Sequence, residues 1–247
     1  MIPNWSIARV VAHFIVLAQF SQQSAGRALR GDSLPPSLPG GQRFTPETFR
    51  ARSTAKQEEL SLKSRSELLT LFDASGSDLV DLFRRMAPHN MTRLAWTPAG
   101  TWTLAMFVSM RVFELGLHGW DIHAALDSTS TIRPRLLSFL LGLQMHVLKR
   151  YFQASPELDG LYRFDLGSVS WMMDISNGKI QHRPMEVDPD SVVRTDVNNF
   201  LLLATGRRTA KQLESRGLLN LEGDVQRTEA LLKVIVESVD RASFRYT

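Results

Sequence analysis

The chain has 247 residues, a length that fits one large domain or two ordinary ones and allows a substantial hydrophobic core. It contains no cysteine, which excludes disulfides, thiolate metal sites and cysteine nucleophiles. A net charge of +4 favours a small anionic ligand, whereas the lack of a dense basic run interleaved with aromatic residues speaks against nucleic acid as a partner.

The first predicted element is a helix over residues 4–31, in which Val10, His13 and Leu17 recur at helical spacing. Its apolar run, ARVVAHFIVLAQF, is too short to span a membrane and is interrupted by His13 and Gln19. No small-residue cleavage site follows it. We therefore expect neither a signal peptide nor a membrane partner, and the lack of cysteine fits a cytoplasmic protein.

The next helices are separated by loops rich in proline, glycine and polar residues. Three are expected, at residues 45–86 with a break near Gly76, at 100–126 and at 133–152. The stretch APHNMTRLAWTPAGTW, before the second of these, is expected to be a loop. Four amphipathic helices in succession are typical of a bundle.

The sequence pattern changes after SPELDG. Four segments are predicted as strands: YRFDL, SVSWMMDI, KIQHR and SVVRTD. The dipeptide Asn177-Gly178 predicts a hairpin turn between the second and third strands. VNNFLLLATGRR, TAKQLESRG and RTEALLKVIVESVDRASF are predicted as helices, and LLNLEGD as a short strand or turn. We therefore expect a four-helix bundle over residues 1–153 and a smaller α+β domain over residues 154–247.

Charged residues interrupt the apolar helix at residues 100–126. At about 100° per residue, Arg111, Glu114, His118 and Asp121 share one narrow stripe. The stripe either faces water or points inward and holds a ligand, because buried charge is costly unless it is paired or bound to metal. The rest of the helix surface is largely apolar, which favours the inward orientation.

The stripe suggests a metal site. Glu114 and His118, one turn apart, can reach one ion, but a stable site needs a third ligand. His13, on the apolar face of the first helix, is the best candidate, although a lone histidine there would more often be a core residue. The other histidines are interpreted as structural or solvated: His89, His123, His146 and His182.

The two remaining polar positions of the stripe have alternative roles. Asp121 is either a solvated carboxylate, a weak additional ligand or the acceptor of a hydrogen bond that orients a ligand, and we favour the last. Arg111 either pairs with Glu114 or Asp121, or receives a substrate carboxylate through its planar guanidinium. Both are candidate catalytic residues.

Two segments resemble those of the mycothiol-dependent maleylpyruvate isomerase family. NWSIARVVAHFIVL resembles the segment in which a tryptophan turn leads into the helix with the first metal-binding histidine. RVFELGLHGWDIHAAL resembles the second signature of that family, an Arg followed by Glu-x-x-x-His and Trp-Asp. The tail, through VSWMMDISNGKI, VNNFLLLATGRR and LLNLEGD, is similar to the sterol carrier protein type 2 fold.

The resemblance covers nearly the whole chain and implies a DinB-like bundle followed by a sterol-carrier-like domain. It implies a divalent metal, zinc most often, held by His13, Glu114 and His118, and mycothiol or another small thiol as cofactor. The implied reaction is an isomerisation or a transfer on a small electrophilic or anionic substrate. The thiolate either adds to a cis double bond and leaves after rotation, or it displaces a leaving group or opens an epoxide.

Two features depart from the family pattern. The chain begins twelve residues before His13, where relatives have a further helical segment, so we expect either a misassigned start codon or a missing piece of the pocket wall. A substrate-binding arginine is expected in the C-terminal domain. Arg207 and Arg208 are candidates for it, although a surface role is favoured for both.

Two other functions stay open. One is a non-catalytic metal- or lipid-binding protein of the same architecture. The other is metal-dependent hydrolysis, with water in the open metal position. We expect the C-terminal domain to close the cavity of the bundle rather than to carry a separate catalytic set.

Overall fold

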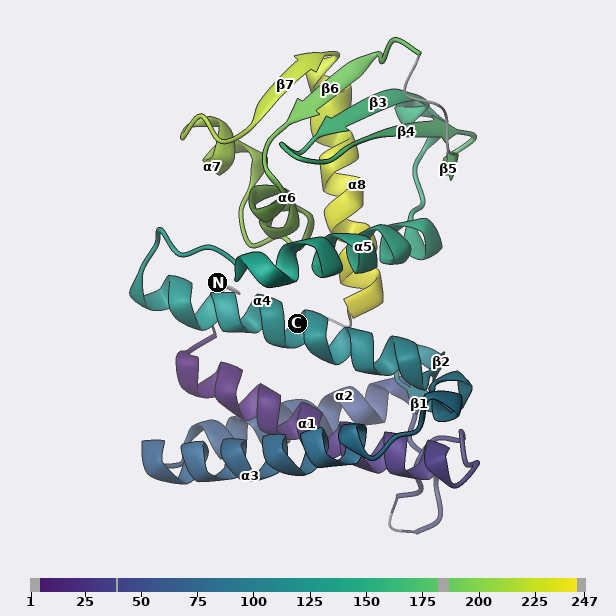
Figure 1. The fold of residues 1–247 in the computed structure, drawn as a ribbon, viewed down its shortest axis with the longest axis vertical. Coiled ribbons are helices and arrows are strands. Elements are labelled where there is room, and N and C mark those ends of the chain that lie inside the picture. Colours follow the sequence, from purple (N-terminus) through teal and green to yellow (C-terminus); the bar gives the residue numbers. More distant parts are fainter. Residues whose placement is uncertain (1–4, 39, 182–186, 244–247) are drawn as a thin grey trace. The chain divides into compact units, whose positions relative to one another are not determined.

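The computed structural model describes residues 5–38, 40–181 and 187–243. It divides into two compact units, one extending to Ser130 and the other beginning at Thr131 (Figure 1). Each unit has its own hydrophobic core. Among the described residues, none of the helices combines the length and the apolar character that a membrane crossing requires.

The N-terminal unit is built around its first helix. Its long helices, within the described residues, are α1 (Ile7–Leu29), α2 (Pro46–Ser61), α3 (Arg65–Arg84) and α4 (Leu104–Leu126). α1 packs against each of the other three, so it lies at the centre of a four-helix bundle (Figure 1). The predicted helix-rich N-terminal region is confirmed, but the bundle does not contain the predicted fourth helix, which follows Pro134.

The break in the second predicted helix lies elsewhere than expected. α2 ends at Ser61 and α3 begins at Arg65, whereas Gly76 lies inside α3. Ser64 starts the new helix through a capping box, in which its hydroxyl accepts from the Glu67 N–H and its own N–H donates to the Glu67 carboxylate over 3.0 Å. The expectation of a break at Gly76 is wrong, because one glycine destabilises a helix by only about 1 kcal/mol.

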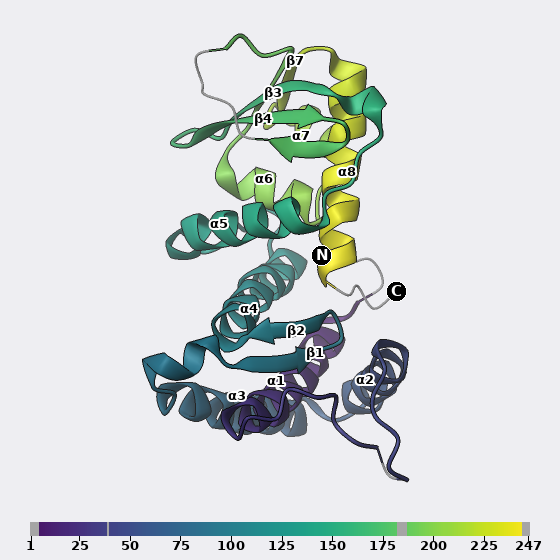
Figure 2. The ribbon, with the colours of Figure 1, turned by 90° about the vertical axis from the view of Figure 1, so that its right-hand side faces the viewer.

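The expected loop before α4 contains regular structure. A short 3₁₀ helix, η1 (Pro88–Thr92), precedes a hairpin of β1 (Leu94–Thr97) and β2 (Gly100–Thr103). Gly100 adopts a positive φ of 109° at the turn. The hairpin lies beside α1 and α4 and buries Ala95 and Trp96 in the core (Figure 2).

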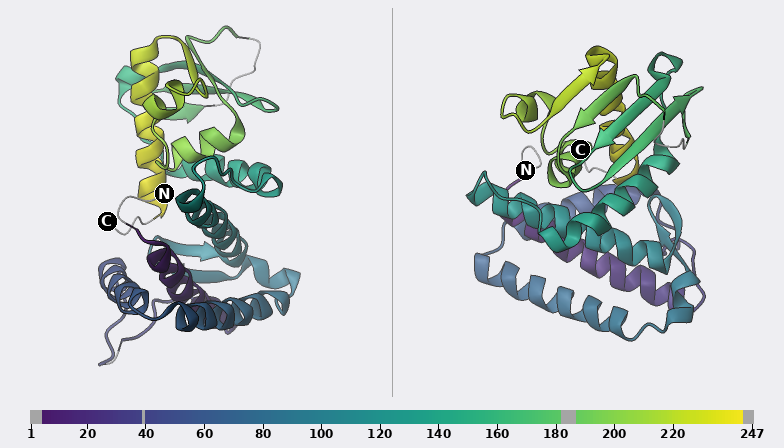
Figure 3. Two further views of the ribbon diagram at one scale, coloured as in Figure 1. Left: turned by 90° about the vertical axis from the view of Figure 1, so that its left-hand side faces the viewer. Right: turned by 45° about the horizontal axis from the view of Figure 1, so that its top comes forward.

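The C-terminal unit contains a five-stranded sheet of order β5-β4-β3-β6-β7, in which only the β3–β6 pair is parallel. Its strands are β3 (Gly160–Asp165), β4 (Ser170–Ser176), β5 (Lys179–Gln181), β6 (Ser191–Arg194) and β7 (Asn220–Gly223). Its helices are α5 (Pro134–Tyr151), η2 (Pro156–Leu158), α6 (Val197–Ala204), α7 (Ala210–Glu214) and α8 (Val225–Ser243). α8 runs along one face of the sheet (Figure 3).

The predicted elements of this unit are confirmed over the described residues, as is the hairpin turn, while the last two residues of the predicted strand KIQHR lie outside them. Asn177 and Gly178 have φ angles of 52° and 69°, as a two-residue turn between twisted strands requires. Asp159 fixes the turn, because its carboxylate accepts from both of these backbone N–H groups, over 2.9 and 3.2 Å.

Helix α5 belongs with the sheet rather than with the bundle. It packs against α6 and α8, and Leu141, Leu148 and Phe152 enter the core of the C-terminal unit. The four helices of the bundle are therefore α1–α4, because the second predicted helix supplies two of them. The expected domain division at residues 153 and 154 stays a prediction.

Candidate metal centre

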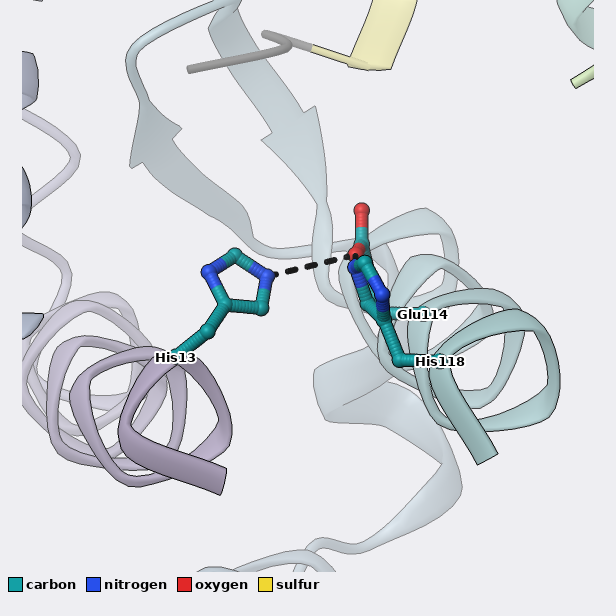
Figure 4. Close-up of side chains that lie close together, drawn as sticks. All are labelled: His13, Glu114 and His118. Atoms are coloured by element: carbon teal, nitrogen blue, oxygen red, sulfur yellow. Dashed lines mark ion pairs between the residues drawn. The ribbon is translucent and has the colours of Figure 1, made fainter. Parts of the chain in front are cut away.

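Helix α1 brings His13 to the interior of the N-terminal unit. The helix begins at the cap residue Ser6, whose hydroxyl accepts from the Arg9 N–H over 3.2 Å. His13 follows nearly two turns later and is 3% exposed. Its imidazole points toward α4 (Figure 4).

Helix α4 presents the polar stripe to the interior. Its cap is Thr103, whose hydroxyl accepts from the Met106 N–H over 3.3 Å. His118 and Asp121 are 5% and 1% exposed, so the stripe does not face water. The apolar surface of the helix is not buried throughout, because Leu115, next to Glu114 in the chain, is 52% exposed.

The structure brings His13, Glu114 and His118 together (Figure 4). Glu114 Oε2 lies 3.6 Å from His13 Nε2 and 3.1 Å from His118 Nε2, and one ligand atom from each of the three side chains lies within 4.8 Å of the others. Metal bonds of about 2.1 Å place neighbouring ligand atoms about 3.0–3.4 Å apart in octahedral or tetrahedral geometry. The donor set therefore suits a divalent cation, and the two distances to Glu114 are close to the spacing that such an ion requires.

Asp121 orients the second histidine. His118 Nδ1 lies 2.9 Å from Asp121 Oδ2, and the carboxylate, which only accepts hydrogen bonds, assigns the proton to Nδ1. The lone pair of Nε2 then faces the Glu114 carboxylate. Two acceptors at that distance require a positive charge between them, either a proton or a metal ion.

The protonation states at neutral pH also suit a metal. Burial lowers the pKa of His13 from 6.5 to about 4, and the positive charge of Arg111 adds to this effect. Burial acts to raise the pKa of Glu114, but the adjacent imidazoles of His118 and His13 and the charge of Arg111 hold it well below its usual value of 4.5. A neutral imidazole and a carboxylate are the forms that bind metal.

Arg111 lies on α4 one turn before Glu114. It is half-buried, its guanidinium carbon lies 6.0 Å from the centre of the Phe107 ring, and its charge lowers the pKa of both His13 and Glu114. The positive charge is therefore close enough to the centre to act on an anionic group bound there.

The other sequence candidates lie outside this group. His89, His123 and His146 are exposed, and His182 lies outside the described residues. Arg207 and Arg208 are in the C-terminal unit, in the turn after α6, where Arg208 Nη1 donates to Asn199 Oδ1 over 2.9 Å. Their role toward a substrate stays a prediction.

Two aromatic residues that were not predicted as site residues enclose the histidines. Trp5 is 8% exposed and stacks on His118, with ring centres 5.9 Å apart. Phe14 meets His118 edge-on at 5.8 Å. The available signal was a tryptophan placed directly before a helix cap, where it can pack onto the first turns of the helix.

Comparison with known proteins identifies both parts of the chain. The family described as the mycothiol maleylpyruvate isomerase N-terminal domain matches residues 2–123, and the SCP-2 sterol transfer family matches residues 150–235. No curated protein matches the chain in sequence.

Solved structures share the fold at low sequence identity. The crystal structure of the mycothiol-dependent maleylpyruvate isomerase is 15% identical, with a TM-score of 0.58, and the match covers 85% of this chain and 77% of that chain. A histidine-to-alanine mutant of that isomerase gives 15% identity and a TM-score of 0.57, covering 84% and 76%. Residues 2–123 therefore belong to the family of mycothiol maleylpyruvate isomerase N-terminal domains, and residues 150–235 belong to the SCP-2 sterol transfer family.

Proposed function

We propose that the protein is a metal-dependent enzyme that uses mycothiol or another small thiol to isomerise, or to transfer the thiol to, a small electrophilic or anionic substrate. His13, Glu114 and His118 hold the metal ion, with zinc as the first candidate. The observation that carries the proposal is the meeting of these three protected donors from two helices of the bundle. The choice of a thiol cofactor is supported by the family match.

The three protein ligands would leave a coordination position of the metal open for a further group. Three protein ligands are typical of catalytic zinc sites, in which a further position stays open. When bound, the metal would stabilise the thiolate form of a small thiol, which supplies the sulfur nucleophile that a cysteine-free chain lacks. Imidazole and carboxylate ligands also accommodate nickel, manganese or iron, so the metal identity must be measured.

Asp121 and the aromatic residues prepare the site. Asp121 fixes the tautomer and the ring orientation of His118, which keeps the Nε2 lone pair available. Trp5 and Phe14 surround the imidazoles with apolar surface and exclude water from this side. Charges in such a site interact more strongly than they do in water.

Arg111 receives the anionic group of the substrate in this proposal. Its guanidinium carries a permanent positive charge next to the centre and can form two parallel hydrogen bonds with a carboxylate. It therefore orients the substrate, while the sulfur nucleophile is delivered by the cofactor.

A thiol requirement separates this proposal from its alternatives. The test is turnover of maleylpyruvate, and of a panel of small epoxides and activated alkenes, by the zinc-loaded protein with and without mycothiol. Turnover that appears only with mycothiol supports the proposal. Equal turnover without any thiol indicates hydrolysis or another water-dependent reaction.

The remaining alternative is a metal- or lipid-binding protein without catalysis. It predicts stoichiometric metal, or uptake of a fluorescent fatty acid by the C-terminal domain, with no thiol-dependent turnover of any panel member. A His118→Ala variant serves as the control in each assay, because a thiol-dependent rate that survives this change does not arise at the centre. The expected cellular location remains the cytoplasm.

A further inference from the structure

We infer that Trp5 is a positioning residue of the metal centre, whose ring holds the imidazoles of His13 and His118 in the orientation that binds the ion. The inference rests on the proposed metal centre and adds to it a residue that does not touch the metal.

The local sequence fixes the place of the indole. Ser6 is the cap of α1, so Trp5 is the residue before the cap and Val10 is the fourth residue of the helix. Trp5, Val10 and Phe14 form one buried apolar cluster. This is a hydrophobic staple, which fixes the direction in which the chain enters a helix. The ring is therefore held in place by α1 itself, without help from a bound ion.

The ring contacts both candidate histidine ligands. It lies parallel to the His118 imidazole, with an angle of 4° between the planes and 5.9 Å between the ring centres. It meets the His13 imidazole at 68°, with the centres 5.1 Å apart. Because the two histidines come from different helices, one side chain limits the rotation of donors on both sides of the ion.

These contacts complement the hydrogen bond to Asp121. That bond restrains His118 in the plane of its ring, at Nδ1, whereas the parallel indole restrains it from above or below. The two restraints together leave one orientation, in which Nε2 faces Glu114. For His13 the indole is packed at a steep angle, so a rotation of the imidazole about its bond to Cβ would meet it.

The indole also has a contact with a polar residue near the start of α1. The guanidinium carbon of Arg9 lies 5.3 Å from the ring centre, and Arg9 Nη2 lies 3.8 Å from Glu58 Oε1 on α2. The ring is therefore in contact with residues of α1 and α4 and is linked through Arg9 to α2.

The test compares Co²⁺ binding to the full-length protein and to two substitutions of Trp5. Trp5→Leu keeps the apolar staple and removes the flat ring, and we expect it to weaken Co²⁺ affinity about 10-fold or more and to alter the visible absorption spectrum of the bound ion. Trp5→Phe restores a ring of smaller size, and we expect it to recover most of the affinity and the spectrum. Thermal melting of the metal-free proteins verifies that each variant is folded.

A matched control separates positioning from general support of the fold. Val10→Ala loosens the same staple but leaves the indole in place, so it should lower the melting temperature and leave the cobalt spectrum unchanged. Tryptophan fluorescence adds a second signal, since Co²⁺ quenches nearby indoles. The larger part of the quench should disappear in Trp5→Phe and persist in Trp96→Phe, which alters a separate cluster.

The possible results separate a failure of the positioning role of Trp5 from a failure of the proposed metal centre. If the natural protein binds Co²⁺ and Trp5→Leu binds it equally well with the same spectrum, the positioning role is refuted and the metal centre stands. A Val10→Ala variant that loses affinity as strongly as Trp5→Leu refutes it too, because the effect is then one of fold stability. A natural protein that binds no Co²⁺ refutes the centre and the inference together.

Discussion

His118 and Asp121 are joined by a buried hydrogen bond of 2.9 Å between Nδ1 and Oδ2. The bond assigns the single proton of a neutral imidazole to Nδ1 and turns the lone pair of Nε2 toward Glu114, 3.1 Å away. One aspartate therefore determines which nitrogen of His118 is available to a metal ion. The same relation gives Asp121 a role that needs no contact with metal or substrate.

Replacing Asp121 by asparagine should weaken zinc binding. The amide is close in size to the carboxylate but carries no charge, so it holds the Nδ1 proton less strongly, and we expect affinity to fall about 10- to 100-fold. A competition titration with a chromophoric zinc chelator measures the change. Asp127→Asn, at the exposed end of the same helix, is the control and should leave the affinity unchanged. Equal affinities of the two variants would contradict the role of Asp121.

Replacing Arg111 by glutamine should impair the use of an anionic substrate without removing the metal. With the guanidinium gone, we expect KM for a carboxylate substrate to rise about 10-fold or more, since a bidentate charged contact is lost. Steady-state kinetics on the active substrate, with zinc content measured in parallel, provide the readout. Arg84→Gln, on an exposed face of α3, is the control. An unchanged KM would assign Arg111 to the fold alone.

The metal-free protein should lose stability as the pH falls below about 6.5. The pKa of His13 is about 4 in the folded protein and near 6.5 when unfolded, so between these values the unfolded chain binds a proton that the folded chain does not. The free energy of unfolding therefore decreases as the pH falls through this window, by up to about 3 kcal/mol from this one group.

Urea unfolding in the presence of a chelator, at about pH 7 and about pH 5, measures this dependence. A His13→Asn variant cannot bind the proton, so its unfolding free energy should change less between the two conditions. A natural protein with the same stability at both values would show that the imidazole is not buried in its neutral form.

The turn after β4 should tolerate substitution poorly. A Cβ added at Gly178 would lie 2.3 Å from the Ala154 carbonyl oxygen, and the residue has a positive φ of 69°. Gly167 also has a positive φ, of 78°, but no atom lies within 4 Å of its added Cβ. We expect Gly178→Ala to lower the unfolding free energy by several kcal/mol and Gly167→Ala by about 1 kcal/mol. Chemical denaturation compares them, and equal losses would show that the close contact relaxes.

Much of the fold is encoded in local signals that the sequence displays. The Asn177-Gly178 turn, the strands beside it and the periodicity of the long helices all lie where pattern and turn chemistry place them. The polar stripe of α4 is also visible in the sequence, because helical geometry alone groups Glu114 and His118. The contact of that stripe with His13 is a tertiary contact that no local pattern encodes. It was predicted because a metal site needs a third ligand and His13 is of a suitable residue type.

The wrong predictions concern elements whose local sequence signals are weak, or whose position depends on packing between residues far apart in the chain. The start of α3 depends on the capping box of Ser64 and Glu67, which is a stronger signal than Gly76. The β1–β2 hairpin consists of two four-residue strands, too short for an alternating pattern to stand out. The amphipathic pattern of α5 is compatible with packing in either unit. Its association with the sheet could not be predicted from that pattern, because the residues it packs against lie far along the chain.

His13, Glu114 and His118 are proposed to hold one metal ion. The most direct test is the metal content of the purified protein after exposure to zinc and removal of the excess, alongside His13→Ala and His118→Ala, with His123→Ala as a control on the exposed side of α4. We expect near-stoichiometric zinc in the natural protein and in His123→Ala, and little in the other two. Zinc that stays bound when His13 is replaced, or a natural protein that takes up none, would contradict it.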